Sequence, residues 1–396
     1  MALNRKQIGN VYRPQGPKAV LLGTSWTSGG KMLVSGPQFD LSVPIEGIRI
    51  VFTLRDVIAT AAMTTPSPLG YFNLIKRIFL TGKNSRANGN VTLWDLDAPT
   101  LALIQASMGK KPWIYSGVTI AGAASAAPGT EASSELISTP VAGLFNGTTG
   151  TYDIRIVIDL PSYPFDCAPY LRPGFGIRTQ EWADSLQLRI EFGTVTNGAD
   201  GALGLDAGTT THTFSARGGG GSPVVDVYSL PVLSGLDVDA SLVPGYLSRV
   251  ATPVTSTLQA AGGLNTNLVT LEKQNTTRIF AIIGTSTTNP TFLTLSDTNL
   301  TTLGFVVGGN RIVRENDDIF AHKMSQVRRY KTNPIQGLIM FDFVPAGNPD
   351  SNYNANDAAA GVTMNLRGTI AGVANAMGIF VQETEQYQPQ GGLYSS

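Results

Sequence analysis

Cysteine and histidine are almost absent from this 396-residue chain. It has one cysteine, Cys167, and two histidines, His212 and His322, which lie far apart in the sequence. A single thiol forms no disulfide within the chain, and structural zinc sites need about four cysteine or histidine ligands. The sequence therefore excludes an intramolecular disulfide and a metal site of these ligands, and it leaves few candidates for Ser–His or Cys–His catalysis.

Charged residues and long apolar runs are also scarce. Charged residues make up 14% of the chain, and 28 Lys and Arg balance 28 Asp and Glu. Proteins that wrap nucleic acid need a basic surface, so we expect no specific nucleic-acid partner. No stretch approaches the roughly 20 apolar residues that cross a bilayer, and the start of the chain has no apolar signal core. We therefore expect synthesis in the cytoplasm followed by assembly, without a membrane-spanning segment.

The motifs of common enzyme classes are missing. Lys31 follows Gly30 but lacks the earlier glycine of a phosphate-binding loop, and the pattern Gly-x-Ser-x-Gly does not occur. A hydrolase of glycosidic bonds would need facing carboxylates. The candidate acid pairs are Asp95 with Asp97, Asp237 with Asp239, Asp317 with Asp318, and Glu383 with Glu385. Because the first and third pairs stand at expected helix starts, where carboxylates favour the helix dipole, we predict no enzyme, no catalytic residues and no cofactor.

The first 39 residues contain basic residues and no acid. Their basic residues are Arg5, Lys6, Arg13, Lys18 and Lys31. The apolar residues of this segment show no sustained helical or strand period. We interpret residues 1–40 as a basic N-terminal arm, which is either a partly ordered terminus with solvated charges or a segment that meets an anionic surface or a neighbouring subunit.

From Leu41 onward, apolar and polar residues alternate in several segments. Ile48, Ile50, Phe52 and Leu54 define the first such segment, and the pattern recurs at residues 152–160 and 186–192. Turn-forming Gly, Pro and Asn separate the segments. This alternation is typical of strands with one buried face, and it predicts an antiparallel sandwich or barrel.

One helix interrupts the strands of each half. Asp97 can cap the first helix, with Pro99 in the first turn and Gly109 at the end, and Asn316 can cap the second. The expected apolar stripes are Leu101, Ile104 and Met108 in the first helix, and Phe320, Met324 and Val327 in the second. Residues three and four apart lie on one helix face, so we expect both stripes to pack inward.

The order of elements in the first half recurs in the second. The strand expected at 277–285 parallels that at 47–54. A pair of strands precedes each helix, and a strand that ends in proline follows it, at Pro161 and at Pro345. The first half is longer by roughly 45 residues, which fall mainly in a stretch of Gly, Ala, Ser and Thr at 116–150. We expect surface loops there and at 196–222.

This order resembles that of the double jelly-roll major capsid proteins of tailless icosahedral viruses with an internal membrane, which infect bacteria or archaea. The most telling match is residues 152–193, where a strand ending in proline is followed by a polar loop and a Leu-x-Leu-x-Ile-x-Phe strand. The resemblance covers nearly the whole chain from Leu41. It implies an all-β fold with two short helices and two consecutive jelly-roll β-sandwiches. The first roll would span 41–235, and the linker and second roll 236–396.

The resemblance also implies a function. The chain would be a major capsid protein whose homotrimers form pseudo-hexagonal capsomers of an icosahedral shell in the virion. Its partners would be further copies of itself, other capsid proteins such as vertex proteins, and lipids of an internal membrane. The membrane-facing or neighbour-facing residues would be Arg5, Lys6, Arg13 and Lys18. A glycan-binding or receptor-binding β-sandwich of a spike protein is the alternative, and a hydrolase that uses one of the acid pairs is a further one.

Overall fold

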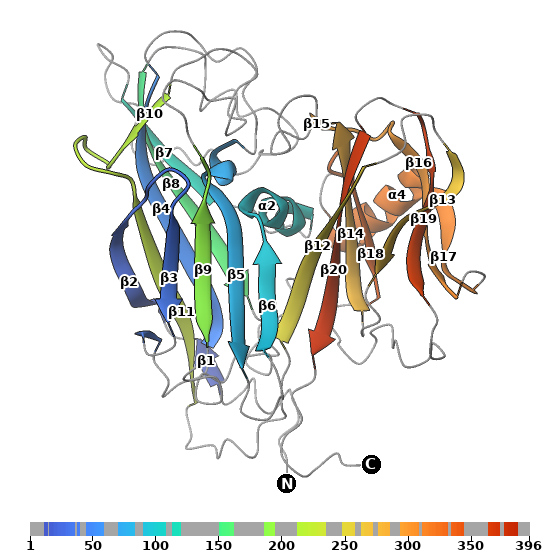
Figure 1. Cartoon of the computed structure of the whole chain (residues 1–396), viewed down its shortest axis with the longest axis horizontal. Helices are drawn as coiled ribbons and strands as arrows, with labels where there is room; N and C mark the ends of the chain where they lie inside the picture. Colours follow the sequence, from blue (N-terminus) through green and yellow to red (C-terminus); the bar gives the residue numbers. More distant parts are fainter. Residues whose placement is uncertain are drawn as a thin grey trace. The chain divides into compact units, whose positions relative to one another are not determined.

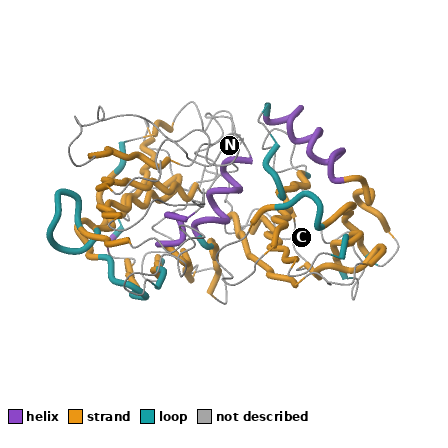
Figure 2. The backbone as a smooth tube through the Cα atoms, turned by 90° about the horizontal axis from the view of Figure 1, so that it is seen from above, coloured by secondary structure: helices purple, strands orange, loops and turns teal. Residues whose placement is uncertain are grey.

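The computed structural model describes residues 12–14, 16–35, 38–39, 45–58, 70–83, 90–107, 113–119, 150–161, 186–194, 212–234, 248–257, 263–271, 276–285, 294–308, 311–331, 334–343, 363–372 and 376–386. Strands make up most of this backbone, and helix is confined to a few segments (Figure 2). The chain divides into two compact units. Unit 1 comprises Met1–Ala102, Lys111–Arg249 and Gln386–Ser396, and unit 2 comprises Leu103–Lys110 and Val250–Glu385. The predicted boundary between residues 235 and 236 lies outside the described residues.

The first sheet of unit 1 is antiparallel and centres on β4 (Figure 1). Its strands are β1 (Tyr12–Pro14), β2 (Lys18–Ser25), β4 (Ile45–Ile58), β7 (Trp113–Thr119), β8 (Gly150–Pro161), β10 (His212–Ser215) and β11 (Val224–Ser234). The order is β1-β11-β4-β8-β7, with β2 on β11 and β10 on β4. The predicted alternation sets the inner face, because Ile48, Ile50 and Phe52 are buried while Arg49 and Thr53 are half-buried.

The second sheet of unit 1 is also antiparallel. Its strands are β3 (Lys31–Ser35), β5 (Ile75–Lys83), β6 (Asn90–Leu96) and β9 (Gln187–Phe192), in the order β6-β5-β9-β3. A 3-10 turn, η2 (Gly70–Leu74), leads into β5. The predicted strand at 186–192 is confirmed, with Leu188, Ile190 and Phe192 buried between the more exposed Gln187, Arg189 and Glu191.

Trp26 lies between the two sheets of unit 1. Its ring centroid is 6.2 Å from that of Phe52 on β4 and 6.3 Å from that of Phe192 on β9. The indole N–H donates to the Leu74 carbonyl at 3.3 Å, so the buried polar atom is satisfied. The aliphatic side chains around it form the core of the sandwich, and each contributes about 1.5–3 kcal/mol when fully buried.

Unit 2 also contains two antiparallel sheets. The first has β12 (Ser248–Thr257), β14 (Thr276–Thr285), β15 (Thr294–Leu295), β18 (Leu338–Asp342) and β20 (Ala376–Gln386), in the order β15-β14-β20-β12 with β18 on β14. The second has β13 (Gly263–Leu271), β16 (Leu300–Val307), β17 (Arg311–Asp318) and β19 (Met364–Ile370), in the order β13-β19-β16-β17. Ile279 and Phe380 from the first sheet share one core with Phe305 and Leu366 from the second.

The pairing scheme of unit 1 recurs in unit 2, which confirms the predicted repeat. The set β11-β4-β8 corresponds to β20-β14-β18, and the set β6-β5-β9-β3 corresponds to β17-β16-β19-β13. A hairpin precedes the helix in each unit: β5 and β6 precede α2 (Ala98–Ser107), and β16 and β17 precede α4 (Ile319–Tyr330). Each unit is therefore an antiparallel sandwich of the same design.

Helix α2 begins where the sequence predicted. The Asp97 carboxylate accepts from the Thr100 backbone N–H at 2.6 Å, and the Asp97 carbonyl accepts from the Leu101 N–H at 3.1 Å. The predicted inward packing of Leu101 and Ile104 is confirmed, and burial extends beyond that stripe to every residue from Thr100 to Gln105. A helix whose residues are buried on all sides lies in the interior of the protein. Met108 and Gly109 lie outside the described residues.

Helix α4 corrects two predictions. Its cap is Asp318, whose carboxylate accepts from the Phe320 N–H at 2.6 Å, in place of the expected Asn316. Its buried residues are Ile319, Lys323 and Gln326, while Phe320 and Met324 of the predicted inward stripe are exposed and Val327 is half-buried. Polar contacts explain this orientation of the helix. The Lys323 ammonium pairs with Asp297 and donates to the Ile335 carbonyl at 2.7 Å, so the side of α4 that carries Lys323 is held against the rest of the unit.

Part of the predicted basic arm forms strands. Strand β2 pairs with β11, and β3 pairs with β9. The interpretation of an arm without strand periodicity is therefore wrong for these residues. In β3, Met32 and Val34 are buried, while Lys31 and Leu33 are exposed. Because Leu33 is apolar but lies on the outward face, it obscured the alternation in the sequence.

Both predicted loops contain strand at their edges. Strand β7 extends to Thr119, inside the expected loop at 116–150, and residues 120–149 lie outside the described part of the chain. In the expected loop at 196–222, His212–Ser215 forms β10 on the edge of β4. The four glycines from Gly218 to Gly221 then form an exposed turn, each with φ between 79° and 89°. Glycine is required there because this region of φ is unfavourable for residues with a Cβ.

Candidate functional site

His212 is part of a buried polar cluster in unit 1. Its Nδ1 lies 2.6 Å from Asp56 Oδ2, and the Tyr71 hydroxyl donates to the same oxygen at 2.5 Å. All three side chains are buried, and the cluster joins β10 to β4 and to the turn η2. With no solvent access, the arrangement serves to hold these elements together.

His322 has a comparable structural position in unit 2. Its Nε2 lies 2.8 Å from the Leu303 carbonyl oxygen, and its ring stands edge-on to Phe341 with centroids 4.8 Å apart. These contacts attach α4 to β16 and β18. No cluster of three or more His, Cys, Asp or Glu that could hold a metal ion is found in the described ranges.

Those acids of the predicted pairs whose side chains the structure describes are engaged in structural contacts. Asp95 binds Arg77 through two hydrogen bonds, and Asp97 and Asp318 cap helices. Glu383 binds Arg278. Asp237 and Asp239 lie outside the described residues, and the side chains of Asp317 and Glu385 are not described.

The cap of α2 has a perturbed acidity. Burial raises the pKa of the Asp97 carboxyl, and the hydrogen bonds from Thr100 oppose this effect without cancelling it. The folded protein therefore favours the protonated form of Asp97 more than the unfolded chain does.

Two ion pairs cross from β4 to β8 on the outer face of the first sheet. Arg49 binds Asp159 with Nε–Oδ1 and Nη2–Oδ2 distances of 2.6 and 2.8 Å. Arg55 binds Asp153 in the same way, at 2.7 and 3.0 Å. The hydrogen bond to Asp153 raises the pKa of Arg55, against a smaller effect of burial. The geometry is bidentate, which is the strong form of the arginine–carboxylate contact.

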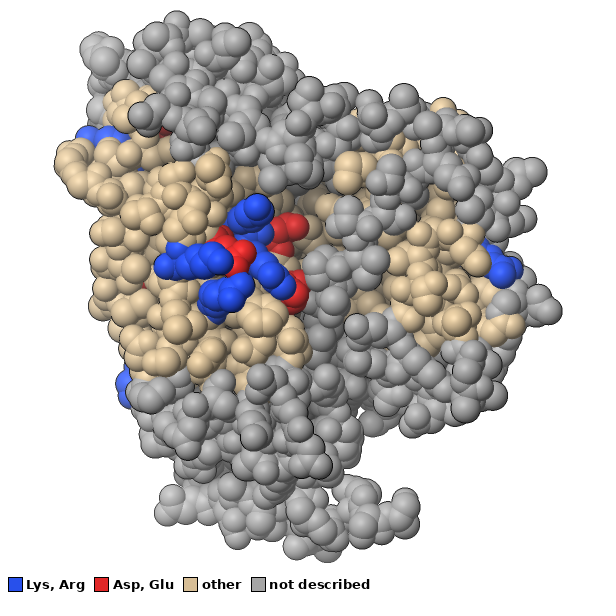
Figure 3. Space-filling model, in the orientation of Figure 1, with Lys and Arg blue, Asp and Glu red and all other residues tan. Residues whose placement is uncertain are grey.

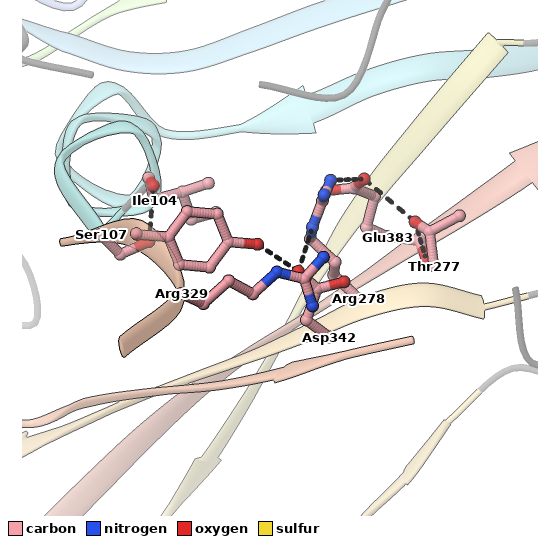
Figure 4. A network of polar contacts seen from close by, with 8 residues as sticks. Ile104, Ser107, Thr277, Arg278, Arg329, Asp342 and Glu383 are labelled. Atoms are coloured by element: carbon pink, nitrogen blue, oxygen red, sulfur yellow. Dashed lines mark hydrogen bonds and ion pairs between the residues drawn. The ribbon is translucent and has the colours of Figure 1, made fainter. Parts of the chain in front are cut away.

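Unit 2 has the equivalent pair at the equivalent strands, but there it is fully buried. Arg278 on β14 stands opposite Asp342 on β18 and Glu383 on β20. Its Nε lies 3.3 Å from Asp342 Oδ2, and its Nη1 lies 3.2 Å from Glu383 Oε1 (Figure 4). Its side chain has no exposed surface.

Further polar groups complete this network around Asp342 and Glu383. Arg329 at the end of α4 places Nη1 3.0 Å from Asp342 Oδ2, and the Tyr330 hydroxyl donates to the same carboxylate. The Thr277 hydroxyl donates to Glu383 Oε1 at 3.0 Å. Figure 4 draws these residues with Ile104 and Ser107 of α2, and the segment Leu103–Lys110, which includes the second half of α2, belongs to unit 2. The buried guanidinium therefore has charge partners on two neighbouring strands.

A second group of charges lies over β3, β9, β5 and β6 (Figure 3). Arg77 and Arg189 flank the Phe79 ring, with guanidinium carbons 5.0 and 5.8 Å from its centroid. Glu191 accepts from Arg189 at 2.5 Å and lies 3.6 Å from the Lys31 ammonium. Burial works to raise the pKa of Glu191, but the hydrogen bond from Arg189 and the surrounding cations lower it below its usual value.

Large apolar side chains are exposed at four positions of the described chain. Leu22 and Leu33 in unit 1 are 56% and 55% exposed, and Phe320 and Met324 on α4 are 69% and 38% exposed. Phe320 and Met324 are four residues apart, so they form one continuous surface on the helix. Exposed apolar surface on a helix is a candidate contact with another molecule.

The predicted arm residues are only partly described. Arg5 and Lys6 lie outside the described residues, and Arg13 lies in β1. Lys18 begins β2 and is exposed, and its carbonyl accepts from the Ser229 hydroxyl at 3.4 Å. Sequence reasoning missed the ionic network around Arg278. The signal was the repeated pairing of an Arg-Ile strand with a later Asp strand, at Arg49 and Asp159 and again at Arg278 and Asp342.

The fold that these two units define is the double jelly roll, as predicted. The chain is similar to an atomic structure of Sulfolobus turreted icosahedral virus, with a TM-score of 0.59 and 12% identity over 96% of this chain and 91% of that chain. It is similar to the crystal structure of the major capsid protein of that virus, with a TM-score of 0.58 and 13% identity over 97% of this chain and 99% of that chain. It is also similar to the Faustovirus major capsid protein, with a TM-score of 0.52 and 10% identity over 96% and 90% of the two chains. No protein-family model matches the sequence, and no curated protein matches it.

Proposed function

We propose that the chain is a major capsid protein that assembles into an icosahedral viral shell. The observation that carries the proposal is the similarity over nearly the whole length of both chains, since capsid proteins of two different viruses share this succession of two jelly rolls. A likeness confined to one sandwich would fit many unrelated functions, because β-sandwiches are used widely.

The capsomer of this proposal is a homotrimer. Each chain provides two sandwiches of the same design, so three chains provide six similar bodies around an axis and a pseudo-hexagonal outline. The polar residues described above support a structural role, because the histidines and the acid pairs bind neighbouring strands and helices. The protein acts through assembly, without catalysis.

The N-terminal arm is proposed to face the interior of the shell. Arg5, Lys6, Arg13 and Lys18 belong to the acid-free first 39 residues and would meet anionic headgroups of an internal membrane, each contributing about 1 kcal/mol near such a surface. Because Lys18 begins β2, a test should spare this strand. Arg5→Gln with Lys6→Gln should reduce flotation with vesicles of phosphatidylglycerol. Unchanged flotation would remove the membrane contact from the proposal.

Other features of the proposal follow from the same role. The partners are further copies of the chain and other capsid proteins, such as vertex proteins. The chain would be made in the host cytoplasm and act in the virion. No helix in the described segments is long and apolar enough to cross a membrane.

Light scattering and electron microscopy of the purified full chain test the function directly. The expected result is a mass of three chains and, at higher concentration or in lysate, large closed particles. A monomer or small oligomer that binds glycans and forms no particles under any condition would favour the receptor-binding sandwich instead.

A further inference from the structure

The two helices occupy equivalent places in the repeat, but only one of them is fully covered. Helix α2 follows the hairpin β5–β6 and has six successive buried residues, Thr100 to Gln105. Helix α4 follows the hairpin β16–β17 and exposes Phe320, Met324 and Arg328. The same helix surface is thus covered in the first repeat but apolar and exposed in the second. This difference indicates that α4 lacks a neighbour that would cover it.

The sheets that contain β14 and β4 also differ in burial, but here the strand of unit 2 is the more buried one. In unit 2, every residue of β14 from Thr276 to Ile283 is buried, so both faces of this strand are covered. In unit 1, the equivalent strands β4 and β8 leave Thr53 half-buried and Arg155 exposed on their outer face. The ion pairs show the same contrast, because the Arg49 side chain is 35% exposed while that of Arg278 is 0% exposed.

Residues Leu103–Lys110 hold the second half of α2 and belong to unit 2. Ile104 and Ser107 are drawn together with the Arg278 network in Figure 4. The second half of a helix that follows the hairpin of the first repeat is therefore part of unit 2.

We infer that the outer face of β4 and β8 in unit 1 binds helix α4 of a second copy of this chain. Phe320 and Met324 of that helix would lie over the half-buried Val157, which stands opposite the buried Val51 between the two arginine–aspartate pairs. This inference rests on the proposed homotrimer, and it names the two surfaces that join its subunits. The surfaces are different, so the contact is heterologous, which is the kind of contact that a ring of three copies requires.

Charge complementarity is confined to one end of the contact, because the sheet face also carries the exposed Arg155. Helix α4 contains no acid between Ile319 and Tyr330, and Arg328 and Lys331 are exposed at its C-terminal end. The sheet face presents Asp159, which is 37% exposed beside Arg49. In unit 2 the equivalent Asp342 binds two arginines at once, Arg278 and Arg329. A second guanidinium, Arg328 of the neighbouring copy, therefore fits Asp159 in the same way.

Cross-linking of the full chain tests the contact. In a background with Cys167→Ser, the double variant Arg155→Cys with Phe320→Cys is treated with a short bis-maleimide and separated on a denaturing gel. We expect covalent dimers and closed trimers. The matched control is Leu33→Cys with Phe320→Cys, because Leu33 is equally accessible but lies on the other sheet of unit 1. This control should remain monomeric on the gel.

The other outcomes contradict the inference in distinct ways. Oligomers from Phe320→Cys alone would mean that α4 pairs with itself. Oligomers from the Leu33 control but not from the Arg155 variant would place α4 on the other sheet. A trimer by light scattering with no link in either variant would overturn this contact and leave the proposed function intact. A chain that is monomeric before cross-linking would overturn both.

A mutational test needs no cross-linker. Phe320→Asp should shift the mass of the chain from three copies to one, with an unchanged far-ultraviolet circular dichroism spectrum, because this side chain is exposed within its own chain. Leu33→Asp, at an equally exposed leucine, should leave the trimer intact. If the Arg155 double variant fails to fold, Thr53→Cys with Met324→Cys probes the same two surfaces. A trimer that withstands Phe320→Asp contradicts the inference.

Discussion

A fully buried arginine is tolerated only where fixed carboxylates neutralise its charge, and Arg278 has two of them. Its counterpart Arg49 makes the same cross-strand contact with Asp159 on a partly exposed face. The repeat therefore places one type of ion pair in two environments. Their energies should differ, because removing a charge from a buried pair leaves its partner without compensation, while water solvates an exposed one.

Replacing each arginine by methionine measures this difference. Arg278→Met should lower the free energy of unfolding by about 3–5 kcal/mol, since the buried Glu383 would lose its ion pair with Arg278 and Asp342 would keep only the one with Arg329. Arg49→Met should lower it by about 1 kcal/mol or less. Urea unfolding followed by tryptophan fluorescence gives both values. Similar losses in the two variants would show that burial does not govern the strength of these pairs.

The cap of α2 predicts a pH dependence. Because the pKa of Asp97 is raised in the folded state, its ionisation weakens the fold as pH rises from the usual aspartate range through the raised value. Asp97→Asn keeps the cap without the charge, so it should be more stable than the native chain at neutral pH. That advantage should shrink as the pH falls through the raised pKa.

Asp97→Ala is the control for the hydrogen bond itself. It removes the acceptor for the Thr100 N–H and should cost about 1 kcal/mol relative to Asn at every pH. Thermal unfolding across the acid range compares the three chains. If Asn and Ala destabilise equally at neutral pH, the charge and not the hydrogen bond maintains the helix start.

At the scale of elements, the turn from Gly218 to Gly221 depends on its backbone conformation. Gly220 has a φ of 80° and open space around a Cβ, so only the backbone opposes a side chain there. Gly220→Ala should cost about 1–2 kcal/mol. Gly16→Ala is the matched control, because it also has open space but no positive φ, and it should change stability little. Equal effects in a melting experiment would contradict this account.

The strands could be predicted from the sequence, and the outward surfaces could not. Alternation located β4, β8 and β9 because one face of each strand is apolar and buried. The same logic placed Phe320 and Met324 inward, and it was wrong because Lys323 supplies the anchoring contacts of α4. Periodicity identifies an apolar face but does not say whether the chain itself or another molecule covers it.

The candidate site was harder to predict for a related reason. Arg278 and Glu383 are 105 residues apart, and their contact follows from the pairing of β14 with β20. Sequence reasoning assigned Glu383 to a possible acid pair with Glu385, because neighbours in sequence are visible before neighbours across a sheet. The helix cap at Asp97, a local contact, was predicted correctly.

At the scale of the whole molecule, the apolar character of the inferred contact predicts how assembly responds to salt. A contact centred on Phe320 and Met324 is mainly apolar, so the trimer should persist from low salt to about 1 M, where charges are screened within about 3 Å. Binding of the basic arm to anionic vesicles should be lost over the same range. Light scattering and flotation measure the two effects. A trimer that dissociates at high salt would indicate a contact dominated by ion pairs.

The exposed turn between β10 and β11 has a practical consequence. Ser215 pairs with Arg55 and Val224 pairs with Thr53, so the chain leaves the edge of β4 and returns to it almost at the same place. The sheet fixes where residues 216–223 begin and end but does not fix their number. A foreign peptide inserted after Gly219 should therefore be tolerated, and an assembled shell would present it in many regularly spaced copies.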